Sequence, residues 1–162
     1  LGEARSLRQA VLGTPVLLSV DALEMALGEG LVQACLESSV EYATSRTQFG
    51  REIAGFQLVQ DMIADISLDA DAARLLVWRA ADLIDRGGDF RIAASKAKLY
   101  ASEAAVRAAN HCIQIYGGAG YVDEYPAAKY LRDARVMTLY EGTSQVQKLL
   151  IGRDETGISA FV

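Results

Sequence analysis

Glu141 is the acidic residue of this chain best placed to take part in chemistry. It lies in Leu139-Tyr140-Glu141-Gly142-Thr143-Ser144-Gln145-Val146-Gln147, between an apolar stretch and an expected helix start. Ser144, followed three residues later by Gln147, fits a capping box. A carboxylate just before a helix, beside a glycine that lets a ligand approach the backbone, can act on a bound substrate. The alternative is that Glu141 only complements the helix dipole.

A second candidate loop, Arg46-Thr47-Gln48-Phe49-Gly50, combines three kinds of side chain that can bind a nucleotide. Its arginine can pair with a phosphate, its glutamine can form hydrogen bonds, and its phenyl ring can pack on a flat heterocycle. The alternative is a helix C-terminus, where the arginine complements the dipole and Gly50 ends the helix. The segment alone favours this alternative.

A third candidate loop, Gln114-Ile115-Tyr116-Gly117-Gly118-Ala119-Gly120-Tyr121, is rich in glycine. It is not a dinucleotide-binding fingerprint, because a helix is expected before it and Asp123 occupies the place of the third small residue. The lysine of a phosphate-binding loop is also absent. Bare glycine backbone could hold the polar tail of a cofactor, although a plain helix end is the simpler interpretation.

Long helices must position these loops. Apolar and small residues recur at helical spacing over about residues 17–45, 59–87 and 90–116, and the alanines of the third segment predict close contact between helices. A shorter helix should follow Pro126, and a last helix should begin near Thr143. No long segment has strand periodicity. The sequence therefore predicts an all-α, up-and-down bundle.

The bundle is expected over residues 17–154. Residues 1–16 are expected to lead in from a preceding domain, and residues 155–162 to form a tail. Trp78 and His111 fall inside predicted helices and are interpreted as packing residues. The series Asp65, Asp69, Asp71 and Arg74 is interpreted as a solvated helix face.

Composition excludes several classes of protein. The chain of 162 residues can bury one sizeable core, and a net charge of -5 without long like-charge runs argues against nucleic acid or anionic membrane as a partner. The sequence contains no run of 18 apolar residues, so it predicts no membrane span. Cys35 and Cys112 are isolated and His111 is the only histidine, so we expect a reducing cytoplasm and no metal site.

Seven motifs, in this order and spacing, resemble the C-terminal helical domain of acyl-CoA dehydrogenases over residues 17–154. They are Arg46-Thr47-Gln48-Phe49-Gly50, Phe56-Gln57, Ala94-Ser95-Lys96-Ala97-Lys98, Gln114 to Tyr121, Glu124-Tyr125-Pro126, Arg132-Asp133-Ala134 and Tyr140 to Gln147.

The resemblance implies a reaction. In such enzymes a glutamate at the position of Glu141 removes the α-proton of an acyl-CoA thioester, and a hydride leaves the β-carbon for flavin N5. The product is a 2,3-enoyl-CoA, and the electrons pass to an electron-transferring flavoprotein. The developing enolate oxygen needs aimed donors, which in this family are the backbone N–H of the same glutamate and the ribityl chain of the flavin.

The resemblance also implies roles for the other loops. Arg46, Gln48 and Phe49 match positions that hold the pyrophosphate and adenosine of FAD, and Gln57 matches a further position near the cofactor. The segment Gln114, Ile115, Tyr116, Gly117 and Gly118 matches one that reaches the FAD of a neighbouring subunit, so a dimer or a dimer of dimers is expected. Thr143, Ser144 and Gln145 match cofactor contacts beside the base, and Tyr140 and Gly142 match substrate contacts. The expected compartment is the cytoplasm, or the mitochondrial matrix in a eukaryote.

Two departures limit the resemblance. The N-terminal helical domain and the middle β-domain usual in this family are missing, so we expect a fragment or one chain of an assembly. The family commonly has an arginine after a Leu-Asp pair near Asp21, whereas no arginine lies between Arg8 and Arg46. Two alternatives therefore stay open: an acyl-CoA oxidase relative, and a non-catalytic helical subunit that completes a flavoprotein oligomer.

Overall fold

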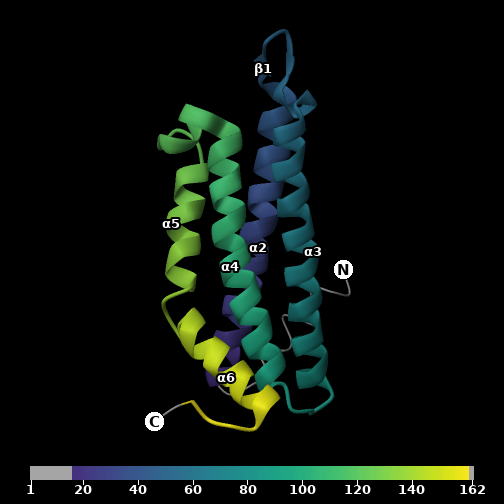
Figure 1. Ribbon diagram of the computed structural model, residues 1–162, viewed down its shortest axis with the longest axis vertical. Coiled ribbons are helices and arrows are strands. Elements are labelled where there is room, and N and C mark those ends of the chain that lie inside the picture. Colours follow the sequence, from purple (N-terminus) through teal and green to yellow (C-terminus); the bar gives the residue numbers. More distant parts are fainter. Residues whose placement is uncertain (1–15, 161–162) are drawn as a thin grey trace.

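The computed structural model describes residues 16–160 and contains five α-helices in that range. They are α2 (Val16–Ser45), α3 (Gln57–Asp85), α4 (Arg91–Tyr116), α5 (Ala127–Met137) and α6 (Ser144–Thr156). The first four lie side by side along the long axis, and α6 lies below the end of α5 and runs obliquely against the lower part of α4 (Figure 1). The predicted all-α bundle is confirmed, with helix bounds within a few residues of those expected. Apart from Val16, the expected lead-in lies outside the described residues.

The helix ends follow the signals in the sequence. Pro126 is the N-cap residue of α5, where its missing N–H leaves no hydrogen bond unmade. Gly117 ends α4 with φ +59, and its N–H donates to the Gln114 carbonyl. The short 3-10 helix η2 (Gly117–Tyr121) then turns the chain toward α5.

Helix α4 is the centre of the core and packs on the four other α-helices. Its buried face consists mainly of alanines, and Ala97, Ala101, Ala104 and Ala108 are fully buried. A Cβ added at Gly28 of α2 would lie 2.9 Å from the Ala101 Cβ. The predicted close contact between helices is therefore confirmed, because small side chains let the backbones approach.

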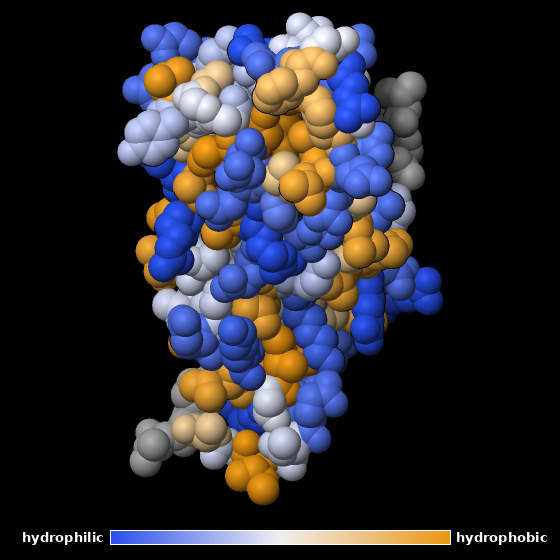
Figure 2. All heavy atoms as spheres, turned by 45° about the horizontal axis from the view of Figure 1, so that its top comes forward, coloured by the Kyte–Doolittle hydropathy of each residue, from blue (hydrophilic) through white to orange (hydrophobic). Residues whose placement is uncertain are grey.

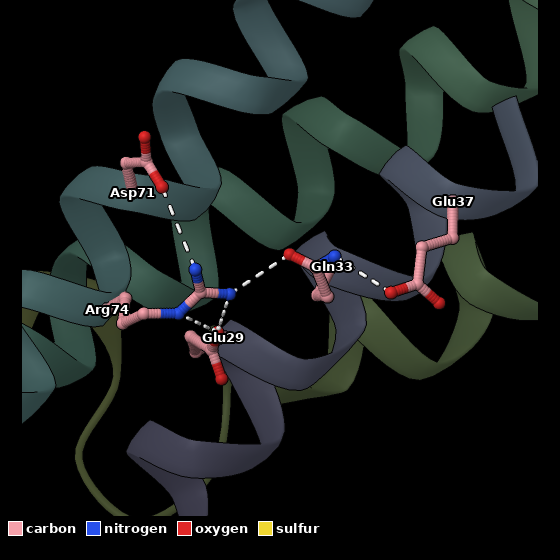
Figure 3. A network of polar contacts seen from close by, with 5 residues as sticks. All are labelled: Glu29, Gln33, Glu37, Asp71 and Arg74. Carbon is pink, nitrogen blue, oxygen red and sulfur yellow. Dashed lines mark hydrogen bonds and ion pairs between the residues drawn. The ribbon is translucent and has the colours of Figure 1, made fainter. Parts of the chain in front are cut away.

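The interpretation of the α3 charges as a solvated face is wrong for Asp69 and Arg74. Asp69 accepts hydrogen bonds from the Tyr100 hydroxyl (2.8 Å) and the Arg107 guanidinium (2.7 Å), both on α4. Burial and this hydrogen bond raise the pKa of Tyr100. Arg74 reaches α2 and donates to Glu29 (2.8 Å) and Gln33 (3.0 Å) (Figure 3). Both residues join helices because they flank the buried row of α3.

The interpretation of Trp78 as a packing residue is also wrong, since 43% of it is exposed. It follows Val77, which belongs to the buried series Ile66, Ala70, Ala73, Val77 and Ala80, and one step along a helix turns a side chain by about 100°. Leu58, Leu68 and Leu75 of α3 are exposed as well. Figure 2 shows apolar patches scattered among polar atoms on one face of the molecule.

His111 of α4, the other residue that was interpreted as packing, is half-buried, and its Nε2 lies 3.5 Å from the Asp65 carboxylate.

The first candidate loop forms a small hairpin that the sequence pattern did not predict. Strand β1 (Thr47–Gln48) pairs antiparallel with β2 (Arg51–Glu52), and the short 3-10 helix η1 (Ile53–Gly55) follows. Helix α2 already ends at Ser45, and Gly50 lies in the hairpin turn with φ +81. The alternative in which Gly50 ends the helix is therefore wrong. Strands of two residues are too short to show a period.

Two features are absent from the described part of the chain. Between residues 16 and 160, no helix is both long enough and apolar enough to cross a membrane. In the same range, no three residues of the types His, Cys, Asp or Glu come together as metal ligands.

Candidate functional site

The Glu141 loop has an unusual backbone. Glu141 has φ +48 and Gly142 has φ +90, so two successive residues lie in the left-handed region. Such a conformation is rare for a residue with a Cβ and persists only where surrounding contacts hold it. The turn leaves the Glu141 side chain exposed, directly before the first turn of α6. The carboxylate is thus open to a ligand while its backbone is held.

A buried lysine of α4 holds this loop. Lys98 is 4% exposed, and its Nζ donates to the Tyr140 carbonyl (2.8 Å) and to the Gly142 carbonyl. The cation therefore binds the backbone on both sides of Glu141. Lys98 lies in the motif of residues 94–98, but no role was predicted for it from the sequence. A usable signal existed, because Lys98 shares its helical row with the buried residues Ala94, Ala101 and Ala105.

Helix α6 begins one residue earlier than the capping box implies. Thr143 is the N-cap residue, and its hydroxyl accepts from the Val146 N–H (3.3 Å). Ser144 lies inside the first turn, where its buried hydroxyl donates to Glu103 of α4 (2.6 Å). The capping box of Ser144 and Gln147 is therefore wrong, since Thr143 and Ser144 are both possible caps and the contact with α4 decides between them.

Gln147 closes the loop from the side of α6. It is 7% exposed, and its Nε2 donates weakly to the Gly142 carbonyl (3.4 Å). Its Oε1 is buried and has no hydrogen-bond partner among the described residues. A buried amide oxygen without a partner is costly, so a ligand donor at this position would be favoured.

A pocket of about 320 Å³ opens beside Glu141. Its polar side chains are those of Arg91, Ser95, Lys98, Glu141 and Gln147, and Phe90 and Leu150 are among those that contribute apolar surface. A carboxylate at the edge of a partly apolar pocket loses water when an apolar ligand enters. The arrangement suits a general base acting on an apolar substrate.

The other predicted site residues lie at the hairpin end of the bundle, near β1 in Figure 1. A second pocket of about 440 Å³ is lined there by Arg46 and Gln48, by Ile115 to Gly118, and by Tyr42 and Tyr125. Phe49 is 93% exposed with φ +52, and Gln57 is the exposed first residue of α3. A guanidinium, an exposed flat ring and bare glycine backbone form a surface that can hold a phosphorylated ligand with a flat ring.

Ile115 and Tyr116 contribute to this end mainly by packing. They are 5% and 8% exposed. The Tyr116 ring stacks on Tyr42 with centroids 3.9 Å apart, its hydroxyl lies 2.7 Å from the Ser38 hydroxyl, and burial raises its pKa. At Gly117 and Gly118, by contrast, an added Cβ would meet no atom within 4 Å. The glycine backbone is the accessible part of the segment.

The structure does not bring all predicted site residues together. Tyr140, Glu141, Gly142, Thr143, Ser144 and Gln145 lie around the first turn of α6. The remaining ones lie at the hairpin end. Lys98 marks the first group on α4 and Tyr116 the second, and the 18 helical steps from one to the other correspond to roughly 27 Å. These are two separate surfaces of one chain.

Comparison with known proteins identifies relatives of the chain. The family described as "Acyl-CoA dehydrogenase, C-terminal domain" matches residues 19–155. The chain is 48% identical over 128 residues to the "Probable acyl-CoA dehydrogenase YngJ" of Bacillus subtilis, covering 79% of this chain and 34% of that protein. It is 46% identical over 122 residues to the "Caffeyl-CoA reductase-Etf complex subunit CarC" of Acetobacterium woodii, covering 75% and 32%.

A solved structure shows the same fold. A glutaryl-CoA dehydrogenase from Mycobacterium smegmatis, solved in complex with FADH2, superposes with a TM-score of 0.86 at 27% identity, over 90% of this chain and 38% of that one. The chain thus spans about a third of the length of each of these relatives.

Proposed function

Because the chain belongs to the acyl-CoA dehydrogenase family, matching its C-terminal domain, we propose that it carries the catalytic base of an FAD-dependent acyl-CoA dehydrogenase. The reaction removes one hydrogen from the α-carbon and one from the β-carbon of an acyl-CoA thioester. The observation that carries the proposal is the exposed Glu141 carboxylate on a backbone held from both sides by Lys98.

The chemistry of the step follows from this position. Glu141 takes the α-proton, the electron pair of the broken C–H bond moves into the new Cα–Cβ double bond, and the hydride leaves the β-carbon. Negative charge develops on the thioester oxygen, so a donor aimed at that oxygen lowers the barrier. The Glu141 N–H is such a donor, because within residues 16–160 it donates no hydrogen bond.

The residues at the hairpin end fit FAD. The exposed Arg46 guanidinium suits a pyrophosphate, the exposed Phe49 ring suits a flat heterocycle, and the open backbone of Gly117 and Gly118 allows close approach. Gln48, Gln57 and Gln114 supply hydrogen-bonding groups there. FAD, when bound, would supply the hydride acceptor. Near the base, the buried Gln147 Oε1 could accept from a cofactor or substrate group.

We propose that two copies of the chain complete each site. Glu141 and the hairpin end are roughly 27 Å apart along α4, so one copy supplies the base while another supplies the FAD-binding loops. The exposed leucines and Trp78 of α3 add apolar surface that suits an assembly. The "Etf complex" in the name of CarC supports an electron-transferring flavoprotein as the acceptor.

The replacement Glu141→Gln in the FAD-loaded protein tests this function. It keeps the size of the side chain and removes the base, so turnover of acyl-CoA should fall at least about 100-fold. Exchange of the substrate α-proton with deuterated water should be lost in parallel, while the flavin absorption bands stay. The matched control is Glu155→Gln, an exposed glutamate of α6 outside the pocket, which should leave turnover unchanged.

Near wild-type turnover by Glu141→Gln would refute the base assignment. A flavin-loaded protein that binds acyl-CoA and exchanges no α-proton even with Glu141 present would instead support a non-catalytic subunit.

A further inference from the structure

Lys98 is a costly residue to bury. Its ammonium lies on an otherwise alanine-rich face of α4, 4% exposed, and it is bound by two backbone carbonyls of the Glu141 loop. Burying a charged group without good partners is strongly unfavourable, so such a residue is retained where its position matters. A neutral side chain could fill the same space. The contacts of the ammonium therefore call for a specific explanation.

The two accepting carbonyls belong to the residues on either side of Glu141. The peptide that joins Tyr140 to Glu141 is trans, as are the other described peptides. In a trans peptide the C=O and the N–H point in opposite directions. Because the Tyr140 carbonyl points to Lys98, the Glu141 N–H of the same peptide points away from Lys98.

The charge of Lys98 also strengthens this donor. A cation bound to a carbonyl oxygen withdraws electron density through the peptide, and hydrogen bonds in a chain polarise one another. The N–H of that peptide then donates a stronger hydrogen bond. The effect is large where water is excluded, as it is around a buried ammonium.

We propose that Lys98 is a positioning residue that aims and polarises the Glu141 N–H as the donor to the substrate thioester oxygen. This rests on the proposed function, in which Glu141 is the base. Lys98 thereby sets two properties of one residue, the place of its carboxylate and the direction of its N–H. The Gly142 contact fixes the second side of the turn, where φ is +90.

The first test uses the whole 162-residue chain without flavin or substrate. The replacement Lys98→Met keeps the unbranched shape of the side chain, shortens it by one atom and removes the charge. In nuclear magnetic resonance spectra, the carbonyl carbons of Tyr140 and Gly142 and the Glu141 amide should shift relative to wild type. The matched control is Lys96→Met on the same helix, whose ammonium pairs with Glu155 at the surface (2.7 Å). It should leave these resonances in place.

The second test uses the FAD-loaded protein. A donor that acts on charge developing in the transition state affects kcat more than KM. Lys98→Met should therefore lower kcat by about 10- to 100-fold with little change in KM. Lys96→Met should match wild type in both. If Lys98→Met changes neither the Glu141 amide nor kcat beyond the control, the inference is overturned.

Two further variants keep the outcome clear. If Lys98→Met loses its helical circular dichroism, Lys98→Arg is tested instead. The arginine keeps the positive charge but cannot place one point charge between both carbonyls. An unmoved Glu141 amide with unchanged kcat in Lys98→Arg would then overturn the inference. Glu141→Gln separates the two proposals: if it retains turnover, the proposed function fails, whereas an inactive Glu141→Gln beside a fully active Lys98→Met rejects the role of Lys98 alone.

Discussion

At the scale of single residues, the Glu141 turn depends on its neighbour Gly142. With φ +90, Gly142 occupies a conformation in which a Cβ is strained. A Cβ there would also lie 2.7 Å from the Gln147 Nε2, which donates to the Gly142 carbonyl. The glycine thus permits both the turn and the contact that closes it.

Gly142→Ala should destabilise the chain by about 2 to 3 kcal/mol, because strain adds to the displacement of Gln147. Gly87→Ala is the matched control, since Gly87 has φ +67 and open space around it, and it should cost only about 1 kcal/mol. Urea unfolding monitored by circular dichroism measures both. An equal loss of unfolding free energy in the two variants would show that the displacement of Gln147 does not affect stability.

The sequence predicted part of this site and missed the rest for a physical reason. Glu141, Gly142 and the nearby helix start are local features, and a pattern can show them. The partners of the loop, Lys98 and Glu103, are about 40 residues away and meet it only through packing of α4 on α6. In the sequence, only the helical row of buried alanines indicates that Lys98, and not Lys96, faces inward.

At the scale of elements, the contact between α2 and α4 depends on a missing side chain. A Cβ at Gly28 would lie 2.9 Å from the Ala101 Cβ and 3.1 Å from its backbone carbon, and neither atom can move without its helix. Gly30, two residues later on α2, is exposed and has no atom within 4 Å of such a Cβ. The two glycines therefore have opposite expected responses to the same change.

Gly28→Ala should destabilise the bundle by about 1 to 3 kcal/mol through overpacking. Gly30→Ala should stabilise it by up to about 1 kcal/mol, because alanine has the higher helix propensity. Thermal and urea unfolding of the two variants measure the difference. A stabilising Gly28→Ala would mean that the two helices are farther apart in solution.

The fold was more predictable than the contacts between its helices. Helix positions follow from apolar spacing, from Pro126 and from Gly117 and Gly118 after α4, and these are properties of short segments. Asp69 and Arg74 were misjudged because a charge beside a buried row can either face water or reach the next helix. The choice depends on partners such as Tyr100 and Glu29, which only the tertiary structure brings near.

At the scale of the whole molecule, the separation of the two surfaces implies a shared site. Glu141 and Arg46 belong to different groups, and roughly 27 Å of α4 lies between the groups. In a symmetric dimer each site would take its base from one copy and its FAD-binding loops from the other. Two inactive variants can then rescue each other.

Arg46→Glu and Glu141→Gln should each abolish turnover when present alone, the first by repelling the pyrophosphate and the second by removing the base. Mixed dimers contain one site with both residues intact. A random one-to-one mixture should therefore regain about a quarter of wild-type turnover, measured after co-expression. No regained activity would mean that both residues serve a site within one copy.

Helix α4 sets an angle as well as a distance between these surfaces. Each residue of a helix turns the chain by about 100° and advances it by about 1.5 Å, so one residue inserted between Lys98 and Tyr116 would barely lengthen the helix. It would, however, rotate Lys98 away from the Glu141 loop relative to Tyr116 and Tyr42. The tight alanine contacts leave no room for α4 to twist back. Insertions of about seven residues would restore the angle and add about 10 Å. The relative orientation of base and cofactor loops is thus encoded in the residue count of one helix.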